Sequence, residues 1–128
     1  MIRQILEECQ QGFNEVVLML SNEVATAEVY MTLSDLRFNE KGDIVTFMAD
    51  GETHLHMYLE QVKEVQFRYR QNNEQDQPSY SVWFMNDDQE PVLRIYMRKS
   101  EKAETNQPRH ALFMSLLEKY GSKVQLGV

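Results

Sequence analysis

The sequence predicts an α+β fold, with a curved antiparallel sheet of about seven strands, an N-terminal helix and a C-terminal helix. The first observation is that residues 14–99 consist mainly of short β-branched, aromatic or alternating runs, separated by turn sequences. The second is that apolar residues recur at helical spacing near the two ends of the chain. Successive strands with short connections pair as antiparallel neighbours, and flanking helices complete the α+β class.

Length, charge and cysteine content narrow the class of protein. One domain is expected over residues 1–128, which is long enough to bury a core. The net charge of −7 disfavours nucleic acid and a polybasic membrane surface as partners. The single cysteine, Cys9, can form no intramolecular disulfide and suits a reducing compartment. No apolar run reaches membrane-spanning length and no signal peptide is evident, so a soluble cytoplasmic protein is expected.

The first third of the chain is predicted to be one helix and two strands. Residues 1–11 form an amphipathic helix that Gly12 ends, because apolar residues recur there at helical spacing: Ile2, Ile5, Leu6 and Cys9. Residues 14–21 are a continuous apolar run that would suit either state, and we choose a strand because two valines begin it. Residues 24–33 are rich in β-branched and aromatic side chains and also predict a strand.

The centre of the chain is predicted to contain two hairpins. A turn at residues 39–42 precedes a strand at 43–49, and Asp50-Gly51 is a two-residue hairpin signal before the strand at 53–59. After a kink at residues 60–63, a strand at 64–70 leads into a polar surface loop at 71–78. The next strands, at 79–86 and 91–99, are joined by an acidic turn at 87–90.

The end of the chain is predicted to be a polar linker and a closing helix. Residues 100–107 are polar, and Pro108 suits a helix start. An apolar face over about twelve residues predicts a helix that Gly121 ends. The tail at residues 124–128 is expected either to add an edge strand or to remain without structure.

The stretch from Gly51 to Arg70 holds the residues that best suit a binding site. His54 and His56 are two apart on a predicted strand and therefore share one face. A single imidazole can ligate a heme iron, since the macrocycle supplies the other four ligands. The cations available for heme propionates are Arg68, Arg70, Arg94, Arg98 and Lys99. On the residues alone, a solvated sheet face is the favoured interpretation of this row of residues.

Other chemistries have less support in the sequence. No glycine-rich phosphate loop, GxSxG motif or HExxH motif occurs. The pair His54–His56 would need further ligands to hold a metal ion by itself. His110, beside Arg109, is interpreted as a surface histidine. No set of residues that could relay protons is recognisable in the sequence, so an enzymatic role such as heme degradation has no support.

The span from Glu52 to Arg98 resembles the bacterial cytoplasmic heme-utilisation proteins, namely the ChuX/HutX group and the repeated domains of the HemS/ChuS group. The resemblance rests on the strand pair HMYLEQVKEVQFRYR, the hairpin YSVWFMNDDQEPVLRIYMRK and a closing helix near Pro108. A weaker match lies in NEVVLMLSNEVATAEV. The similarity implies a curved antiparallel sheet, a homodimer, and heme binding for transport, storage or iron release.

The resemblance also implies positions for the heme contacts. His56 falls where the family places a strand histidine proposed as a heme ligand, and His54 is the alternative in register. Arg94 falls where the family often has a basic residue. Some members carry a second histidine where this chain has Leu20. The leading hypothesis is a heme carrier or storage protein, and the alternative is a dimeric interaction module that kept the fold but lost heme binding.

Overall fold

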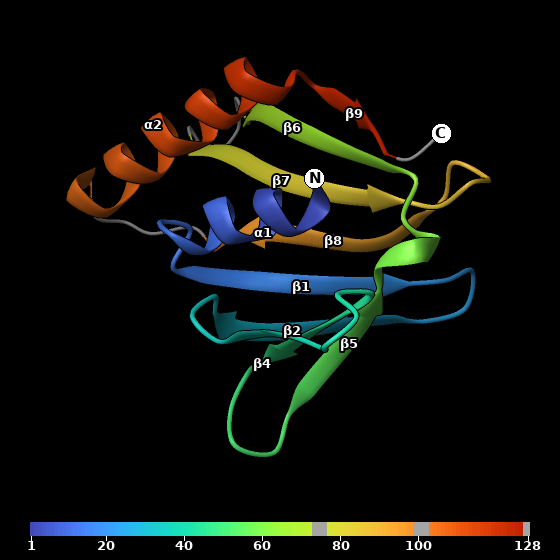
Figure 1. The fold of residues 1–128 in the computed structure, drawn as a ribbon. Helices are drawn as coiled ribbons and strands as arrows, with labels where there is room; N and C mark the ends of the chain where they lie inside the picture. Colours follow the sequence, from blue (N-terminus) through green and yellow to red (C-terminus); the bar gives the residue numbers. More distant parts are fainter. Residues whose placement is uncertain (73–76, 99–102, 127–128) are drawn as a thin grey trace.

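The computed structural model describes residues 1–72, 77–98 and 103–126, which form two antiparallel sheets and two helices (Figure 1). The larger sheet has the strand order β2-β1-β8-β7-β6-β9, and the smaller sheet has the order β3-β4-β5. The helices are α1 (Ile2–Gln10) and α2 (Ala103–Tyr120), and a 3-10 turn, η1 (Leu59–Gln61), joins the sheets. The strands are β1 (Glu15–Ser21), β2 (Thr26–Thr32), β3 (Leu36–Phe38), β4 (Ile44–Met48), β5 (His54–Tyr58), β6 (Glu64–Asn72), β7 (Gln77–Met85), β8 (Pro91–Met97) and β9 (Lys123–Gln125).

One hydrophobic core joins both helices to both sheets. Phe113 of α2 lies against Phe13, Phe67 and Tyr80, with ring centroids 5.2–6.4 Å apart. Buried residues of the smaller sheet belong to the same cluster: Val45, Phe47 and Met57. Because strand side chains alternate, the residues between these inward ones project from the outer face of each sheet. The predicted α+β fold with a helix near each end is confirmed.

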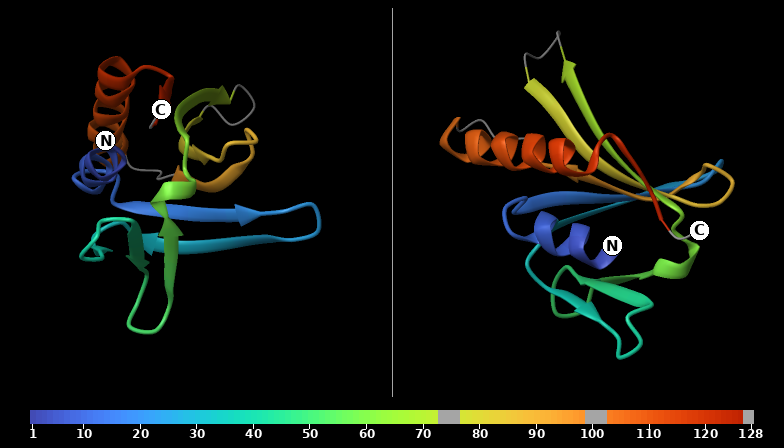
Figure 2. Two further views of the ribbon diagram at one scale, coloured as in Figure 1. Left: turned by 45° about the vertical axis from the view of Figure 1, so that its right-hand side comes forward. Right: turned by 45° about the horizontal axis from the view of Figure 1, so that its top comes forward.

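The strands divide between two sheets, which the sequence did not predict. The described residues contain nine strands instead of about seven, because the short strands β3 and β9 were not counted. The larger sheet twists strongly between β1 and β6 (Figure 2). Strand β5 crosses the direction of β1 and β2 steeply, so the smaller sheet does not continue the plane of the larger one (Figure 2). The tail supplies an edge strand, since β9 pairs with β6.

Two turn and loop predictions need correction. Asp50-Gly51 does not make a two-residue hairpin, because Met48 pairs with His54 and five residues form the loop. The Asp50 carboxylate instead accepts hydrogen bonds from the backbone N–H groups of Glu52 and Thr53 at 2.9 and 2.6 Å. The predicted loop at 71–78 is shorter than expected, since β6 and β7 extend into it, and residues 73–76 lie outside the described part of the chain.

The closing helix begins earlier than the sequence indicated. Helix α2 starts at Ala103, so the predicted linker at 100–107 is mostly helical and Pro108 lies inside the helix. Proline at this position, the sixth residue of the helix, lies beyond the first turn and removes one backbone hydrogen bond of the i→i−4 series. The predicted end is right, because Gly121 has a φ of 83° and donates its N–H to Leu117 O at 2.8 Å.

The two helices approach each other closely at their C-terminal ends. Lys119 Nζ of α2 lies 2.5 Å from Glu8 Oε1 of α1. The hydrogen bond from Lys119 lowers the pKa of the Glu8 carboxyl, against a smaller opposing effect of burial. A Cβ atom on Gly12 would lie 2.8 Å from Leu112 Cδ2. Gly12 therefore follows α1 as predicted, and its small size also allows this approach.

Candidate functional site

The two histidines of β5 share the outer face of the smaller sheet. Leu55 and Met57 turn toward the core, while His54 and His56 are exposed. Their ring centroids lie 5.1 Å apart with the rings edge to face. The prediction that the pair shares a strand face is confirmed.

The ring of His56 is oriented by a threonine on the neighbouring strand. Thr46 of β4 pairs with His56 in register, and its Oγ1 lies 2.7 Å from His56 Nδ1. When Nδ1–H donates to this hydroxyl oxygen, Nε2 keeps a lone pair for a metal. A metal-ligating histidine commonly donates its other ring N–H to a carboxylate, a backbone carbonyl or water, and the Thr46 hydroxyl oxygen would take that part here. The arrangement therefore suits ligation through Nε2.

The arginines lie on the larger sheet, where they surround Trp83. In register, Trp83 pairs with Arg94 of β8 and with Gln66 of β6, so Arg68 is its diagonal neighbour. The guanidinium carbon of Arg68 lies 3.7 Å from the Trp83 ring centroid, and that of Arg94 lies 4.8 Å away. Arg94 also donates a short hydrogen bond to the Ser21 hydroxyl. Arg98 lies further along the sheet, 5.3 Å from the ring of Tyr30.

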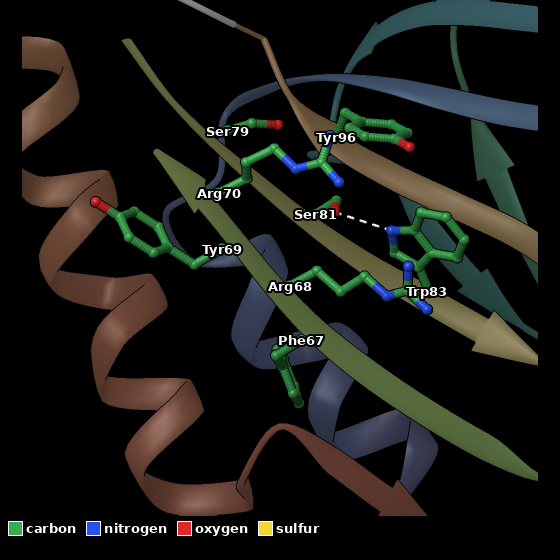
Figure 3. Close-up of a pocket in the computed structure, with 8 residues that line it drawn as sticks. All are labelled: Phe67, Arg68, Tyr69, Arg70, Ser79, Ser81, Trp83 and Tyr96. Atoms are coloured by element: carbon green, nitrogen blue, oxygen red, sulfur yellow. Dashed lines mark hydrogen bonds between the residues drawn. The ribbon is translucent and has the colours of Figure 1, made fainter. Parts of the chain in front are cut away.

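A pocket opens beside this cluster on the outer face of β6, β7 and β8 (Figure 3). Its volume is about 530 Å³, which is within the range of small-molecule sites. The residues that line it are Phe67, Arg68, Tyr69, Arg70, Ser79, Ser81, Trp83 and Tyr96. We call this cavity the Arg68 pocket.

The structure brings some of the predicted site residues together and separates others. Arg68 and Arg70 line the Arg68 pocket, and Arg94 touches its Trp83 wall. His54 and His56 belong to the other sheet and do not line this pocket. The sequence predicted one curved sheet, but the histidines and the arginines lie on two different sheets.

Sequence reasoning missed a polar cluster between α2 and the larger sheet. Tyr80 Oη lies 2.5 Å from Nδ1 of His110, which is exposed as expected but is also held by this contact. Arg109 is buried and donates to the Glu15 carbonyl oxygen at 3.1 Å. Burial lowers the pKa of the Arg109 guanidinium, and burial raises the pKa of Tyr80. The signal was present in the sequence, because Arg109 lies four residues before Phe113 on the core side of α2.

Among the residues that the structure describes, no group of three or more His, Cys, Asp or Glu side chains could hold a metal ion. Over the same residues, no helix is long and apolar enough to cross a membrane.

The fold and the Arg68 pocket define an α+β protein with a ligand-sized site on the open face of its larger sheet. A protein-family model matches residues 3–120 of the chain. No curated protein matches the sequence. The chain belongs to the ChuX/HemS-like family.

Three solved structures illustrate this similarity. A protein from Agrobacterium tumefaciens has a TM-score of 0.70 at 20% identity, over 92% of this chain and 66% of that chain. ChuX has a TM-score of 0.70 at 14% identity, over 91% of this chain and 72% of that chain. The heme-binding protein PhuS from Pseudomonas aeruginosa has a TM-score of 0.68 at 14% identity, over 89% of this chain and 32% of that chain. The chain thus spans about a third of the length of PhuS.

Proposed function

We propose that this chain is a heme-binding carrier or storage protein for heme or iron utilisation in the cytoplasm, with residues 1–128 acting as one domain. Its family membership supports the proposal, and two of its structural neighbours, ChuX and PhuS, are heme-binding proteins. The observation that carries it is the His56 imidazole, which projects from a paired strand while Thr46 engages its Nδ1.

His56 is the proposed axial ligand of the heme iron. His54, which lies two residues earlier on β5, is the alternative ligand. Heme would supply a redox-active iron whose remaining ligands come from the macrocycle. Arg68, Arg70, Arg94 and Arg98 are the proposed partners for propionates, because guanidinium groups bind carboxylates by paired hydrogen bonds. The residue types suit heme, with an imidazole for iron and cations for carboxylates. The two elements lie on different sheets, so they are tested separately.

We expect hemin titration of the purified protein to give a saturable Soret shift at a simple stoichiometry. An imidazole bound to heme iron changes the absorbance of the macrocycle, whereas nonspecific adsorption shows no defined end point. The measurement is absorbance against hemin concentration, with serum albumin as a positive control and heat-unfolded chain as a negative one. A featureless, non-saturating titration would remove the heme-binding proposal and leave the interaction-module alternative.

A homodimer is the second part of the proposal, and exposed apolar residues at the β1–β2 end of the larger sheet support it. Val24 and Leu20 are exposed there, and Tyr30 retains 57% of its accessible surface. Strand β8 does not add to this surface through Leu93, Ile95 and Met97, because these side chains are buried within the chain. A second copy of the chain would cover the β1–β2 end.

We expect sedimentation equilibrium at tens of micromolar to show a dimer, and Tyr30→Glu to weaken its association by about tenfold. A buried aromatic side chain contributes strongly to an interface, and a carboxylate in its place would lack a partner. Tyr58→Glu is the matched control, since Tyr58 is 61% exposed but lies on the smaller sheet. A wild-type monomer, or equal effects of both substitutions, would contradict this interface.

A further inference from the structure

The outer face of β6 carries two buried polar side chains that hold Arg68 in place. Glu64 is 2% exposed and Gln66 is 5% exposed, although both lie on the face opposite the core. Gln66 Nε2 donates to Glu64 Oε1 at 3.2 Å. Gln66 Oε1 in turn accepts hydrogen bonds from Arg68 Nε and Nη2, at 2.9 and 2.6 Å. Two donors on one acceptor fix the plane of the guanidinium group.

Trp83 fixes Arg68 from a second direction. Its ring lies 3.7 Å from the guanidinium carbon, which is stacking distance for a cation on an aromatic face. The indole is itself held, because Trp83 Nε1 donates to Ser81 Oγ at 2.9 Å. A long arginine side chain normally loses considerable rotamer freedom on binding a ligand. Here Gln66 and Trp83 have already restricted that freedom in the folded protein.

The Arg68 pocket is rich in hydrogen-bond donors and contains no carboxylate among its lining residues. Arg68 has five N–H donors, of which the contacts with Gln66 use two. Arg70 also lines the pocket, as do the hydroxyl groups of Ser79, Ser81 and Tyr96 (Figure 3). The protein as a whole has a net charge of −7, so this concentration of cations and hydroxyls is local. Such a set suits an anion, and aromatic walls suit a flat ligand.

We propose that the Arg68 pocket binds planar aromatic carboxylic acids by their carboxylate and ring face, without any metal ion, and that Gln66 is the positioning residue for Arg68. The inference rests on the proposed function, because the propionate-bearing edge of a porphyrin is such a group. It goes further, because it assigns recognition in this pocket to the carboxylate and ring face of the ligand and gives iron coordination no role there. Metal-free porphyrins should therefore bind here.

Trp83 makes the test direct, because it is the single tryptophan of the chain. Protoporphyrin IX, which has two carboxylates and no iron, is titrated against the quenching of Trp83 fluorescence, corrected for porphyrin absorbance. Its dimethyl ester is titrated in the same buffer, with mild detergent to keep both porphyrins monomeric. We expect the acid to bind saturably and the ester to bind at least about tenfold more weakly. Equal binding of acid and ester would overturn the proposal.

Variants separate the pocket from general charge effects. We expect Arg68→Gln to weaken protoporphyrin IX binding by about tenfold, and Gln66→Met by about threefold, because Met keeps the length but removes the acceptor. Arg3→Gln is the matched control, since it removes the same charge from an exposed site on α1. Porphyrin fluorescence anisotropy gives a second readout that does not depend on Trp83. Unchanged affinity in Arg68→Gln, or an equal loss in Arg3→Gln, would contradict the proposal.

The outcome for this pocket is distinguishable from that for heme binding. If hemin gives a His56-dependent Soret shift while protoporphyrin IX fails to bind, the carboxylate pocket is wrong and the proposed function stands. If protoporphyrin IX binds in an Arg68-dependent manner while hemin gives no ligation spectrum, the pocket stands and the role of His56 is wrong.

Discussion

Replacing Phe113 with alanine is expected to lower the free energy of unfolding by about 3–5 kcal/mol. Phe113 is fully buried and lies where four parts of the chain meet. Its ring contacts Phe13 after α1, Phe67 of β6 and Tyr80 of β7. The substitution removes a large apolar side chain and leaves a cavity. Helix α2 cannot move far enough to close this cavity, because the core around it is closely packed.

The measurement is urea unfolding at equilibrium, followed by Trp83 fluorescence and by circular dichroism. Phe113→Leu keeps most of the apolar volume and should cost less, so it remains informative if the alanine variant fails to fold. Glu118→Ala is the control, because Glu118 is exposed on the same helix and should change stability by no more than about 0.5 kcal/mol. A loss below about 1 kcal/mol for Phe113→Ala would show that α2 is not anchored through this residue.

Side-chain direction on the strands could be predicted from the sequence, because burial on one face enforces a period of two. Leu55 and Met57 turn inward and so place His54 and His56 outward. The same rule places Gln66 and Arg68 opposite Phe67 on β6. These directions depend on local sequence alone, and the structure confirms them.

Contacts between strands could not be predicted in this way, because they depend on register. Arg68 meets Trp83 only because Ser81 pairs with Arg68 and Gln66 pairs with Trp83. That register depends on how β6 and β7 are joined, and the sequence of the connection does not determine it. The division into two sheets was missed for a related reason, since the chain leaves the larger sheet between β2 and the three-residue strand β3, where the sequence has no evident pattern.

The start of α2 was missed because the prediction relied on apolar periodicity. Residues 103–107 are largely polar and carry no apolar stripe. Proline is common as the first residue of a helix, so the sequence predicts a start at Pro108. A helix can begin before its apolar face does when its first turn projects beyond the core. The same reliance left Arg109 unnoticed, because a charged residue was not counted as part of the buried face.

Replacing His56 with alanine is expected to change the Soret spectrum of bound heme and to weaken hemin binding by at least about tenfold. Even the loss of a residue that only supports a metal ligand typically costs 10–100-fold in affinity, so loss of the ligand itself should cost no less. The measurement is hemin titration of the wild type and the variant, followed by absorbance. An unchanged spectrum and midpoint would show that His56 is not the iron ligand.

Two further variants identify which histidine acts and how it is positioned. His54→Ala is the matched control, because His54 shares the exposed face of β5 and the same residue type. It should have the smaller effect on both spectrum and affinity. Thr46→Val keeps the shape of the side chain but removes the hydroxyl that engages His56 Nδ1. It should weaken hemin binding less than His56→Ala while leaving a histidine-ligated spectrum.

The two histidines should not act equally, because strand geometry separates them. Residues two apart on a strand differ by about 6.6 Å, so both imidazoles cannot ligate one iron from the same side. His56 has the stronger claim, since backbone pairing fixes its direction and Thr46 fixes its ring. Residual binding in His56→Ala is still expected, because burial of the macrocycle contributes at roughly 25 cal/mol per Å² without any iron ligand. A complete loss of hemin binding would therefore mean that the iron–imidazole bond, and not burial of the macrocycle, accounts for nearly all of the affinity.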